Sequence, residues 1–183
     1  KMLPTLLDMG SWAPKSVGSG ICQEVVVSEP SFDLLPILQC WPKDAGRYIT
    51  LPLVITKDPV TGNRNVGMYR IQITGSKTAM MHWQIHKDGA RHAEEAKARG
   101  KRIEVAVCLG GDPCLPYAAT APLPPQLDEL LFAGFLRKKP VELVRCKTVD
   151  LEVPADCEFV LEGWVDPAEL RTEGPFGDHN GYY

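Results

Sequence analysis

Four side chains between residues 65 and 91 carry groups that could bind an anion or a metal ion. They are the amide of Asn65, the imidazole of His86, and the cations of Arg70 and Lys87. A helical pattern, GARHAEEAKARG, follows directly, and the first turn of a helix presents free N–H groups to anions. Imidazole nitrogen and amide oxygen are also metal ligands. The alternative is a surface hairpin with ordinary solvated charges, and these residues alone leave both interpretations open.

Two strands and a helix must position these groups. Residues 66–74, VGMYRIQIT, alternate in the manner of a strand, which predicts that Arg70 projects from one face of a sheet. A second apolar run at 78–85 follows after a short break. The helical pattern at about 88–99 ends before Gly100, a residue typical of helix C-termini. The sequence therefore predicts a hairpin that leads into the N-terminus of a helix.

The bulk composition limits the class of protein. With 183 residues, 44% of them hydrophobic, the chain can bury a core, and its length favours one domain. A formal net charge of -3 without a Lys/Arg block excludes the concentrated basic face that nucleic-acid binding needs. No apolar run has the length of a membrane span, and the N-terminus lacks a signal-peptide pattern. We therefore expect a cytoplasmic protein with no nucleic-acid partner and no integral membrane segment.

The cysteines and one histidine are interpreted as structural. The cysteines have no C-x-x-C pair and no regular spacing, which indicates reduced core thiols rather than a zinc site or disulfides. They are Cys22, Cys40, Cys108, Cys114, Cys146 and Cys157. His92 lies inside the predicted helix without a partner at metal-ligand spacing, so we interpret it as a structural or surface histidine.

The rest of the chain contains more strand patterns than helix patterns. Residues 1–20 are punctuated by Gly and Pro, and we interpret them as a linker from a missing N-terminal segment that precedes one domain at 21–183. Strands are predicted at 22–27, 47–59 and 101–111 and in two or three runs between 139 and 167, with a helical turn at 31–35 capped by Ser31. Residues 110–125 are predicted to form a loop because of their Gly and Pro content.

A second helix is predicted at 125–137, PQLDELLFAGFLR. It starts with proline and places Asp128 and Glu129 near its positive end. On this spacing Glu129 can be an ordinary surface carboxylate. Because strands outnumber helices and cluster in an antiparallel manner, the predicted fold class is α+β, built on a barrel-like sheet with a few flanking helices.

The closing segment, AELRTEGPFGDHNGYY, carries acids in a loop rich in Gly and Pro. Glu169, Glu173, Asp178 and His179 lie there. Acids on a rigid loop are typical of functional sites and also of solvated turns. Because no helix or strand pattern follows this loop, we interpret the domain as truncated, with a C-terminal domain absent.

Four blocks of sequence together resemble the UbiD family of decarboxylases. They are DPVTGNRNVGMYR at 58–70, MHWQIHKDGARH at 81–92, LFAGFLR at 131–137 and EGPFGDHNGYY at 173–183. Members of that family use prenylated FMN to decarboxylate carboxylic acids reversibly. The resemblance implies the central domain of the family, a split β-barrel related to the FMN-binding barrel of flavin reductases.

The resemblance assigns binding roles to residues at matching positions. Asn65, His86 and Glu129 match the positions that hold a divalent metal, usually Mn2+, at the cofactor phosphate, with K+ as a further ion. Hard oxygen ligands suit Mn2+. The positions that line prenylated FMN correspond to Met68, Tyr69, Arg70, His82, Trp83, Gln84, Lys87 and Asp88. At the position of Asp88 the family often has glycine.

Arg70, Glu173 and Asp178 match the catalytic arginine and the two catalytic acids of the family. An arginine can orient a substrate carboxylate by two hydrogen bonds, and an acid must deliver a proton to the carbon that loses CO2. The second acid, beside Arg70, can tune the pKa of the proton donor. By resemblance we expect Asp178 to be the proton donor, with Glu173 and Arg70 as its partners.

The resemblance therefore implies a metal-assisted carboxy-lyase that acts on an aromatic or α,β-unsaturated carboxylic acid in quinone biosynthesis. The implied partners are the small-molecule acid, a flavin prenyltransferase that supplies the cofactor, and further copies of the chain in a homo-oligomer. Two alternatives remain open. The fragment alone can be a flavin-binding and metal-binding module without catalysis, or the chain can be an oxidoreductase of the flavin reductase type. The second alternative gives no reason for Arg70, Glu173 and Asp178.

Overall fold

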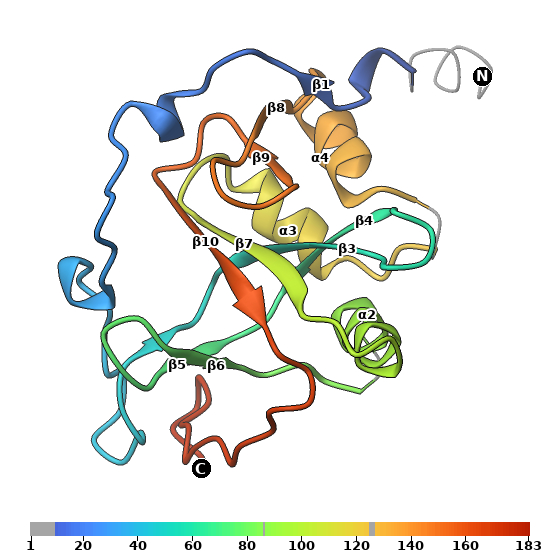
Figure 1. The fold of residues 1–183 in the computed structure, drawn as a ribbon. Helices are drawn as coiled ribbons and strands as arrows, with labels where there is room; N and C mark the ends of the chain where they lie inside the picture. Colours follow the sequence, from blue (N-terminus) through green and yellow to red (C-terminus); the bar gives the residue numbers. More distant parts are fainter. Residues whose placement is uncertain (1–9, 86, 125–126) are drawn as a thin grey trace.

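The computed structural model describes residues 10–85, 87–124 and 127–183. These residues form an α+β domain in which short strands make three sheets and helices cover them (Figure 1). The helices are α2 (Asp88–Ala98), α3 (Cys114–Thr120) and α4 (Glu129–Arg137), and the 3-10 turns are η1 (Gly10–Trp12), η2 (Ile21–Gln23) and η3 (Phe32–Leu34). The strands are β1 (Lys15–Ser16), β2 (Tyr48–Ile49), β3 (Leu53–Lys57), β4 (Arg64–Met68), β5 (Ile71–Ile73), β6 (Ala79–Met81), β7 (Ile103–Leu109), β8 (Glu142–Arg145), β9 (Glu152–Pro154) and β10 (Phe159–Val165).

The central sheet has the order β10-β7-β3-β4, and all its neighbouring strands are antiparallel. The two middle strands, IEVAVCL in β7 and LVITK in β3, are rich in the β-branched residues that suit buried strands. Val54 and Ile55 are adjacent in β3 and therefore point to opposite faces, yet both are fully buried. Both faces of the sheet are thus covered.

Different elements cover the two faces. On one face, Ile55 packs in the same cluster as Leu115 of α3 and Leu130 of α4, together with the small sheet β1-β8-β9. On the other face, Val54 packs with Ile71 of the third sheet, β2-β5-β6. The chain after β10 then returns toward β5 and β6, where the C-terminus lies in Figure 1. The central sheet therefore connects the helices to the sheet that carries the end of the chain.

The stretch predicted as one strand at 66–74 is two strands in different sheets. β4 ends at Met68 in the central sheet, whereas β5 begins at Ile71 and pairs with β6. Tyr69 and Arg70 form the corner between them. The predicted hairpin is confirmed in β5 and β6, where Ile71 lies opposite Met81. The prediction of one strand was wrong because the apolar periodicity of the sequence does not change at the corner where the chain passes from one sheet to the next.

Two further segments differ from their predictions. Residues 110–125 were expected to be a loop, but α3 forms there: the Cys114 N–H donates to the Asp112 carboxylate at 2.9 Å, and Pro116 lies in the first turn, where proline is tolerated. The run 47–59 is divided into β2 and β3, with Pro52 buried between them.

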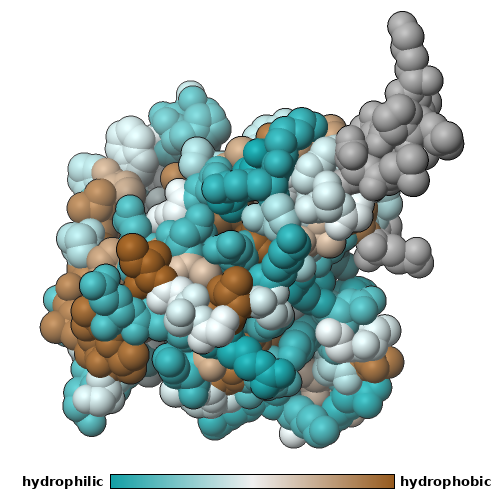
Figure 2. Space-filling view, turned by 90° about the horizontal axis from the view of Figure 1, so that it is seen from above, coloured by the Kyte–Doolittle hydropathy of each residue, from teal (hydrophilic) through white to brown (hydrophobic). Residues whose placement is uncertain are grey.

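Residues 22–27, predicted as a strand, contain part of η2 and then an exposed segment without strand pairing. The exposed apolar side chains of this segment are Val25, Val26 and Val27. Apolar residues gather at the left edge of Figure 2, the side along which this part of the chain runs in Figure 1. The prediction failed because β-branched composition alone does not supply a partner strand.

The remaining element predictions are confirmed. α2 is followed by Gly100 with a φ of 62°, the left-handed conformation expected of a glycine that ends a helix. The side chain of Ser31 caps η3 by accepting from the Asp33 N–H. β7, α4 and the strands β8 to β10 also form where the sequence predicts them.

The segment at 10–20, predicted as part of a linker, packs on the domain. Trp12 is buried and meets the ring of Phe135 edge to face, with centroids 5.3 Å apart. β1 pairs in parallel with β8.

Of the seven residues interpreted as structural, three are buried, three are partly buried and one is exposed. All six cysteines are free, and Cys108 and Cys157 are buried, while Cys40 is exposed and therefore is not a core thiol. His92 is buried beside Thr56, its Nδ1 lying 3.0 Å from the hydroxyl. Within the described ranges, no helix is long and apolar enough to cross a lipid bilayer.

Candidate functional site

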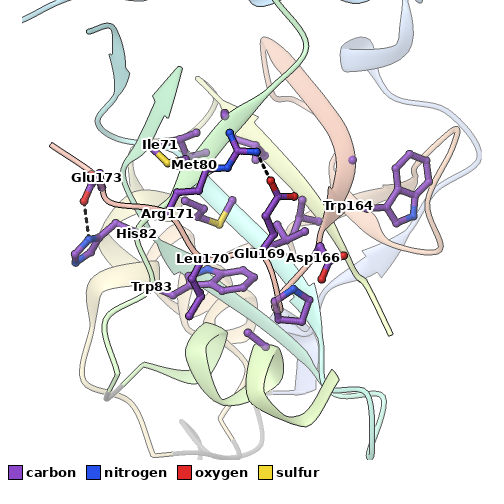
Figure 3. Close-up of a pocket in the computed structure, with 18 of the residues that line it drawn as sticks. Ile71, Met80, His82, Trp83, Trp164, Asp166, Glu169, Leu170, Arg171 and Glu173 are labelled. Atoms are coloured by element: carbon purple, nitrogen blue, oxygen red, sulfur yellow. Dashed lines mark hydrogen bonds and ion pairs between the residues drawn. The ribbon is translucent and has the colours of Figure 1, made fainter. Parts of the chain in front are cut away.

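Arg70 and Glu173 form a two-point ion pair. Arg70 lies at the corner between β4 and β5, and its Nε and Nη2 donate to the two carboxylate oxygens of Glu173 at 2.6 and 2.8 Å. His82, just after β6, places Nδ1 2.8 Å from Glu173 Oε2, as the dashed line in Figure 3 shows. The Glu173 side chain is only 14% exposed. Three residues from separate parts of the sequence therefore meet in one charged cluster.

The segment that carries Glu173 is attached to β5 and to Arg70. The Gly174 N–H donates to Oε1 of Gln72 in β5 at 3.1 Å. The ring of Phe176 lies under the Arg70 guanidinium, 4.6 Å from its carbon to the ring centroid. These contacts come from residues about a hundred positions apart in the chain, and they fix the acid against the arginine.

The environment of Glu173 keeps it ionised. Burial by itself would raise the pKa of this carboxyl, but the hydrogen bonds and positive charge of Arg70, together with His82, outweigh burial, so the pKa lies below its ordinary value. Glu173 is thus a carboxylate that orients Arg70 in this conformation.

Asp178 lies apart from this pair. Its Oδ1 accepts hydrogen bonds from the N–H groups of Asn180 and Tyr182, at 2.8 and 2.9 Å, within its own turn. The backbone hydrogen bond from Tyr182, with that from Asn180, lowers the pKa of Asp178 below its usual value. In the described part of the chain, Asp178 has no hydrogen bond or ion pair with Arg70 or Glu173. The structure therefore brings two of the three predicted catalytic residues into contact.

Asn65 and Glu129 are neighbours in space. Asn65 is a buried polar residue of β4, and the backbone N–H of the next residue, Val66, donates to Glu129 Oε2 at 3.2 Å. Glu129 occupies the first position of α4, directly after Asp128, whose carboxylate caps the helix by accepting from the Leu130 N–H at 2.7 Å. The third predicted metal ligand, His86, lies outside the described residues.

The surroundings of Glu129 favour a cation. Burial raises the pKa of Glu129, and the negative charges of Asp128 and Asp88 raise it further. A buried carboxylate beside like charges is stabilised by a metal ion, and amide and carboxylate oxygens suit a hard ion such as Mn2+. Within the described ranges, no group of three or more His, Cys, Asp or Glu side chains is placed to hold a metal. Of the three predicted metal ligands, Asn65 and Glu129 lie within the described residues, and both carry oxygen donors.

The predicted cofactor-lining residues follow the chain from β4 to the start of α2. Tyr69 is buried, and its ring meets the ring of Trp83 edge to face at 6.4 Å. The Trp83 indole N–H is buried, and among the described residues it has no hydrogen-bond partner. Lys87 precedes α2, and Asp88 begins it and lies 3.4 Å from the Arg91 guanidinium. The acid at this position therefore meets a cation. Met68, His82 and Gln84 complete the set, at the ends of β4 and β6.

A cleft of about 1190 Å³ opens beside the charged cluster. Its walls come from β5, β6, α2, β7, β10 and residues 166–173, and they include Glu173, His82 and Trp83. In Figure 3, Glu169, Leu170 and Arg171 extend over it. Asn65 and Glu129 do not line this cleft. The cleft therefore gives access to the cluster around Glu173.

Two supporting residues could not be found from sequence patterns. Gln72 holds Gly174, and the buried carboxylate of Asp44 accepts from the Gly177 N–H at 2.7 Å. Both residues make contacts between distant parts of the chain, and neither lies in one of the four blocks of the resemblance. Phe176 lies in the final block, and its neighbours Glu173 and Asp178 were the only signal that it belongs to the site.

Comparisons with known proteins agree on one family. The model of the UbiD family, described as the 3-octaprenyl-4-hydroxybenzoate carboxy-lyase Rift-related domain, matches residues 15–183. An uncharacterised protein of Aquifex aeolicus is 55% identical over 185 residues, which cover 100% of this chain and 38% of that protein. The chain therefore spans less than half the length of this relative.

Solved structures resemble the chain over nearly its whole length. The UbiD-class enzyme HmfF from Pelotomaculum thermopropionicum, in complex with FMN, is 33% identical with a TM-score of 0.89, covering 97% of this chain and 42% of that one. An evolved dimeric form of HmfF, in complex with prFMN, has a TM-score of 0.88 at 33% identity, covering 100% and 44%. Vanillic acid decarboxylase of Sedimentibacter hydroxybenzoicus, in its closed form, has a TM-score of 0.89 at 28% identity, covering 100% and 42%.

Proposed function

The chain belongs to the UbiD family, and from this premise we propose that it is the cofactor-binding part of a carboxy-lyase. The reaction is the reversible, metal-assisted decarboxylation of an aromatic or α,β-unsaturated carboxylic acid with prenylated FMN. HmfF binds FMN and prFMN, and vanillic acid decarboxylase is named for its decarboxylation. These relatives support the reaction class and the cofactor.

The two-point pair of Arg70 and Glu173 is the observation that carries the proposal. A guanidinium that binds both oxygens of one carboxylate has the geometry to bind both oxygens of a substrate carboxylate. The neighbouring cleft leaves room for a small organic acid. When the substrate carboxylate binds Arg70, the hydrogen bonds between Arg70 and Glu173 weaken, so the pKa of Glu173 rises toward its ordinary value. Glu173 thereby becomes able to exchange a proton with its surroundings.

Asp178 is the residue that we assign to protonate the carbon that loses CO2. Its backbone hydrogen bonds keep its pKa low in this conformation, so this role requires the turn at 178–182 to open. When bound, prenylated FMN supplies the electron sink for that carbon. The protein residues orient the substrate, exclude water and deliver the proton.

Asn65 and Glu129, together with His86, are the ligands that we assign to Mn2+, with K+ as a further ion. Met68, Tyr69, Arg70, His82, Trp83, Gln84, Lys87 and Asp88 are the residues that we assign to the surroundings of the cofactor. The positive charge of Lys87 and the N-terminus of α2 next to it suit the cofactor phosphate. The partly buried carboxylate of Glu129, which lies beside the backbone of β4, supports the metal assignment.

The finer assignments complete the proposal. The three sheets belong to a split β-barrel, the pathway is quinone biosynthesis, and the cofactor comes from a flavin prenyltransferase. The protein acts as a homo-oligomer in the cytoplasm. The dimeric form of HmfF supports self-association, and six free cysteines suit a reducing compartment.

One observation favours a second function for the isolated chain. Because the chain spans 38% of its Aquifex relative, part of the catalytic machinery can belong to the rest of such a protein. The chain by itself would then be a module that binds flavin and metal without turnover.

The test of the proposal is turnover by the intact protein with prenylated FMN and Mn2+. Arg70→Ala should lower kcat/KM about a hundredfold or more, because truncating one partner of a hydrogen-bonded charge pair costs about 2 to 5 kcal/mol.

Asp178→Asn should abolish both CO2 release and hydrogen exchange at the reacting carbon while flavin stays bound. The exposed Arg102→Ala serves as the matched control and should leave turnover unchanged. Undiminished turnover of Arg70→Ala would contradict the proposal.

A further inference from the structure

Tyr69 is a buried phenol enclosed by two glycines. It is 4% exposed at the corner between β4 and β5. A Cβ on Gly67 would collide with the Tyr69 hydroxyl and ring, and a Cβ on Gly89 would lie 2.9 Å from Tyr69 Cζ and 3.0 Å from Trp83 Nε1. The ring therefore fits only because both neighbouring positions lack a side chain. A residue enclosed in this way has a fixed hydroxyl position.

The Tyr69 hydroxyl accepts two hydrogen bonds. One comes from Nδ2 of Asn65 at 3.3 Å, and the other comes from the backbone N–H of Gly89, in the first turn of α2, at 3.2 Å. A phenolic oxygen has acceptor capacity for two donors and one proton of its own. Tyr69 thus connects the side chain of Asn65 to the start of α2.

In the structure, the Asn65 amide presents Nδ2 to the Tyr69 oxygen. The two ends of an amide differ, because nitrogen only donates and oxygen only accepts. When Nδ2 is held by Tyr69, Oδ1 points away from the phenol. Metal ions bind the oxygen of an asparagine side chain, so the orientation decides whether Asn65 can be a ligand.

We propose that Tyr69 is a positioning residue for the candidate metal site. Its hydroxyl orients the Asn65 side chain so that Oδ1 faces the ion, and it connects this side chain to the first turn of α2. This inference rests on the proposed function, because it requires that Asn65 bind the metal. It gives Tyr69 a role that does not depend on contact with the flavin. It also explains why Gly67 and Gly89 both flank the ring.

The test compares Mn2+ binding by the intact protein and its Tyr69→Phe variant in the presence of FMN. Binding is followed by loss of the electron paramagnetic resonance signal of free Mn2+ and by calorimetry. Phenylalanine keeps the ring in its slot and removes only the hydroxyl. We expect affinity for Mn2+ to fall about tenfold, the lower end of the effect of removing a group that orients a metal ligand.

A second pair of variants separates an effect on the orientation of the Asn65 amide from a general loss of packing around Tyr69. Asn65→Asp replaces the amide by a carboxylate, whose two ends are both oxygens, so no orientation remains to be selected. In the Asn65→Asp background, Tyr69→Phe should therefore leave Mn2+ affinity unchanged. An equal loss of affinity in both backgrounds would show that Tyr69 acts only by packing and would overturn the inference.

The remaining outcomes are also decisive. If Tyr69→Phe binds Mn2+ as tightly as the parent or more tightly, then the phenol does not present Oδ1 to the ion, and the inference fails while the proposed function stands. If the parent protein binds no Mn2+ with FMN, then the metal assignment in the proposed function fails, and the role of Tyr69 fails with it. Thermal unfolding of each variant confirms that the compared proteins are folded.

Discussion

Glu173 is held by two partners, and this sets what its carboxyl group can do. Arg70 donates hydrogen bonds to both carboxylate oxygens of Glu173, and His82 contacts one of these oxygens. We predict that Glu173→Gln lowers kcat by about 10² to 10⁴, the range for loss of one acid or base group. Steady-state turnover of the intact protein measures it. Glu24→Gln, at an exposed acid that does not line the cleft, is the control and should retain activity. An unchanged kcat in Glu173→Gln would remove this carboxyl from the reaction.

Asp58 illustrates a residue whose chemistry serves stability. Its buried carboxylate accepts from Arg91 Nη1 at 2.6 Å and from the N–H groups of Val60 and Thr61 at 2.8 and 3.1 Å. Burial alone would raise the pKa of Asp58, but these hydrogen bonds outweigh it and the pKa is strongly lowered. We predict that Asp58→Asn lowers the free energy of unfolding at pH 7 by about 1.5 to 3 kcal/mol, the range for hydrogen bonds to a charged group.

The pH dependence of this effect has a definite sign. Because the folded pKa of Asp58 lies below the unfolded value of about 3.9, its contribution is complete above that value and is lost as the pH falls toward the folded pKa. The difference in unfolding free energy between parent and Asp58→Asn should therefore shrink below about pH 4, as urea denaturation at several pH values would show. Asp150→Asn, at an exposed pair with Lys57, is the control and should change stability little. A difference that stayed constant down to pH 2 would contradict this account.

At the scale of elements, the loop before β2 holds the acidic segment in place. Asp44 is buried and accepts from the N–H groups of Trp41 and Gly177 at 2.9 and 2.7 Å. The Trp41 ring covers Gly177 so closely that a Cβ there would lie 2.6 Å from it. Tyr48 then packs on Phe176, with centroids 4.7 Å apart. The positions of Glu173 and Asp178 thus depend on a loop that contains no catalytic group.

We predict that Asp44→Ala lowers kcat by up to about a hundredfold, because a displacement of about 1 Å at a reacting group has that effect. The variant should also become sensitive to limited proteolysis between residues 173 and 183, since Gly177 loses its acceptor. Asp33→Ala removes the exposed carboxylate that pairs with Arg47 in the same region and serves as the control. Normal turnover together with normal protease resistance in Asp44→Ala would mean that the loop does not position the acids.

The elements differ in how far the sequence could predict them. α2 and α4 carry local signals, namely Gly100 after one helix and Asp128 before the other, and both were predicted. The corner at Tyr69 and Arg70 was missed because the alternation of apolar residues does not record a change of sheet. α3 was missed because its apolar contacts at Leu115 and Ala118 with the core outweigh the Gly and Pro content around it. In each failure, contacts between distant segments decided the outcome.

The candidate site shows the same division. The residues with chemical groups were found from their types and from the family resemblance, and Arg70 and Glu173 do meet. The placement of Asp178 in its own turn depends on local backbone hydrogen bonds that no motif encodes. Asp44 could not be found, because it acts on Gly177 across 133 positions of the chain.

At the scale of the molecule, one short stretch of chain, residues 65–70, connects the two parts of the candidate site. Asn65, at its start in β4, lies beside Glu129, and Arg70, at its end in the corner, pairs with Glu173. β4 is attached to the central sheet through five paired positions with β3, from Leu53 opposite Met68 to Lys57 opposite Arg64. Asn65, which we propose as a metal ligand, and Arg70, which we propose to bind the substrate carboxylate, therefore lie on one short segment that is anchored to the central sheet.

Ligand binding to this scaffold should raise the thermal stability of the 183-residue chain. At a concentration one hundred times the dissociation constant, a ligand that binds only the folded state adds about 2.7 kcal/mol. For a chain of this size that corresponds to a rise in Tm of about 5 to 10 °C.

We predict this rise when FMN and Mn2+ are added together, and its reversal by EDTA, as measured by scanning calorimetry. Glu129→Ala should abolish the part of the rise that depends on Mn2+, because the partly buried carboxylate beside Val66 is then missing. Glu142→Ala removes an exposed acid from β8 and should respond as the parent does. A rise with FMN that is the same in EDTA would show that the flavin binds without a metal, and Asn65 and Glu129 would then need a purely structural explanation.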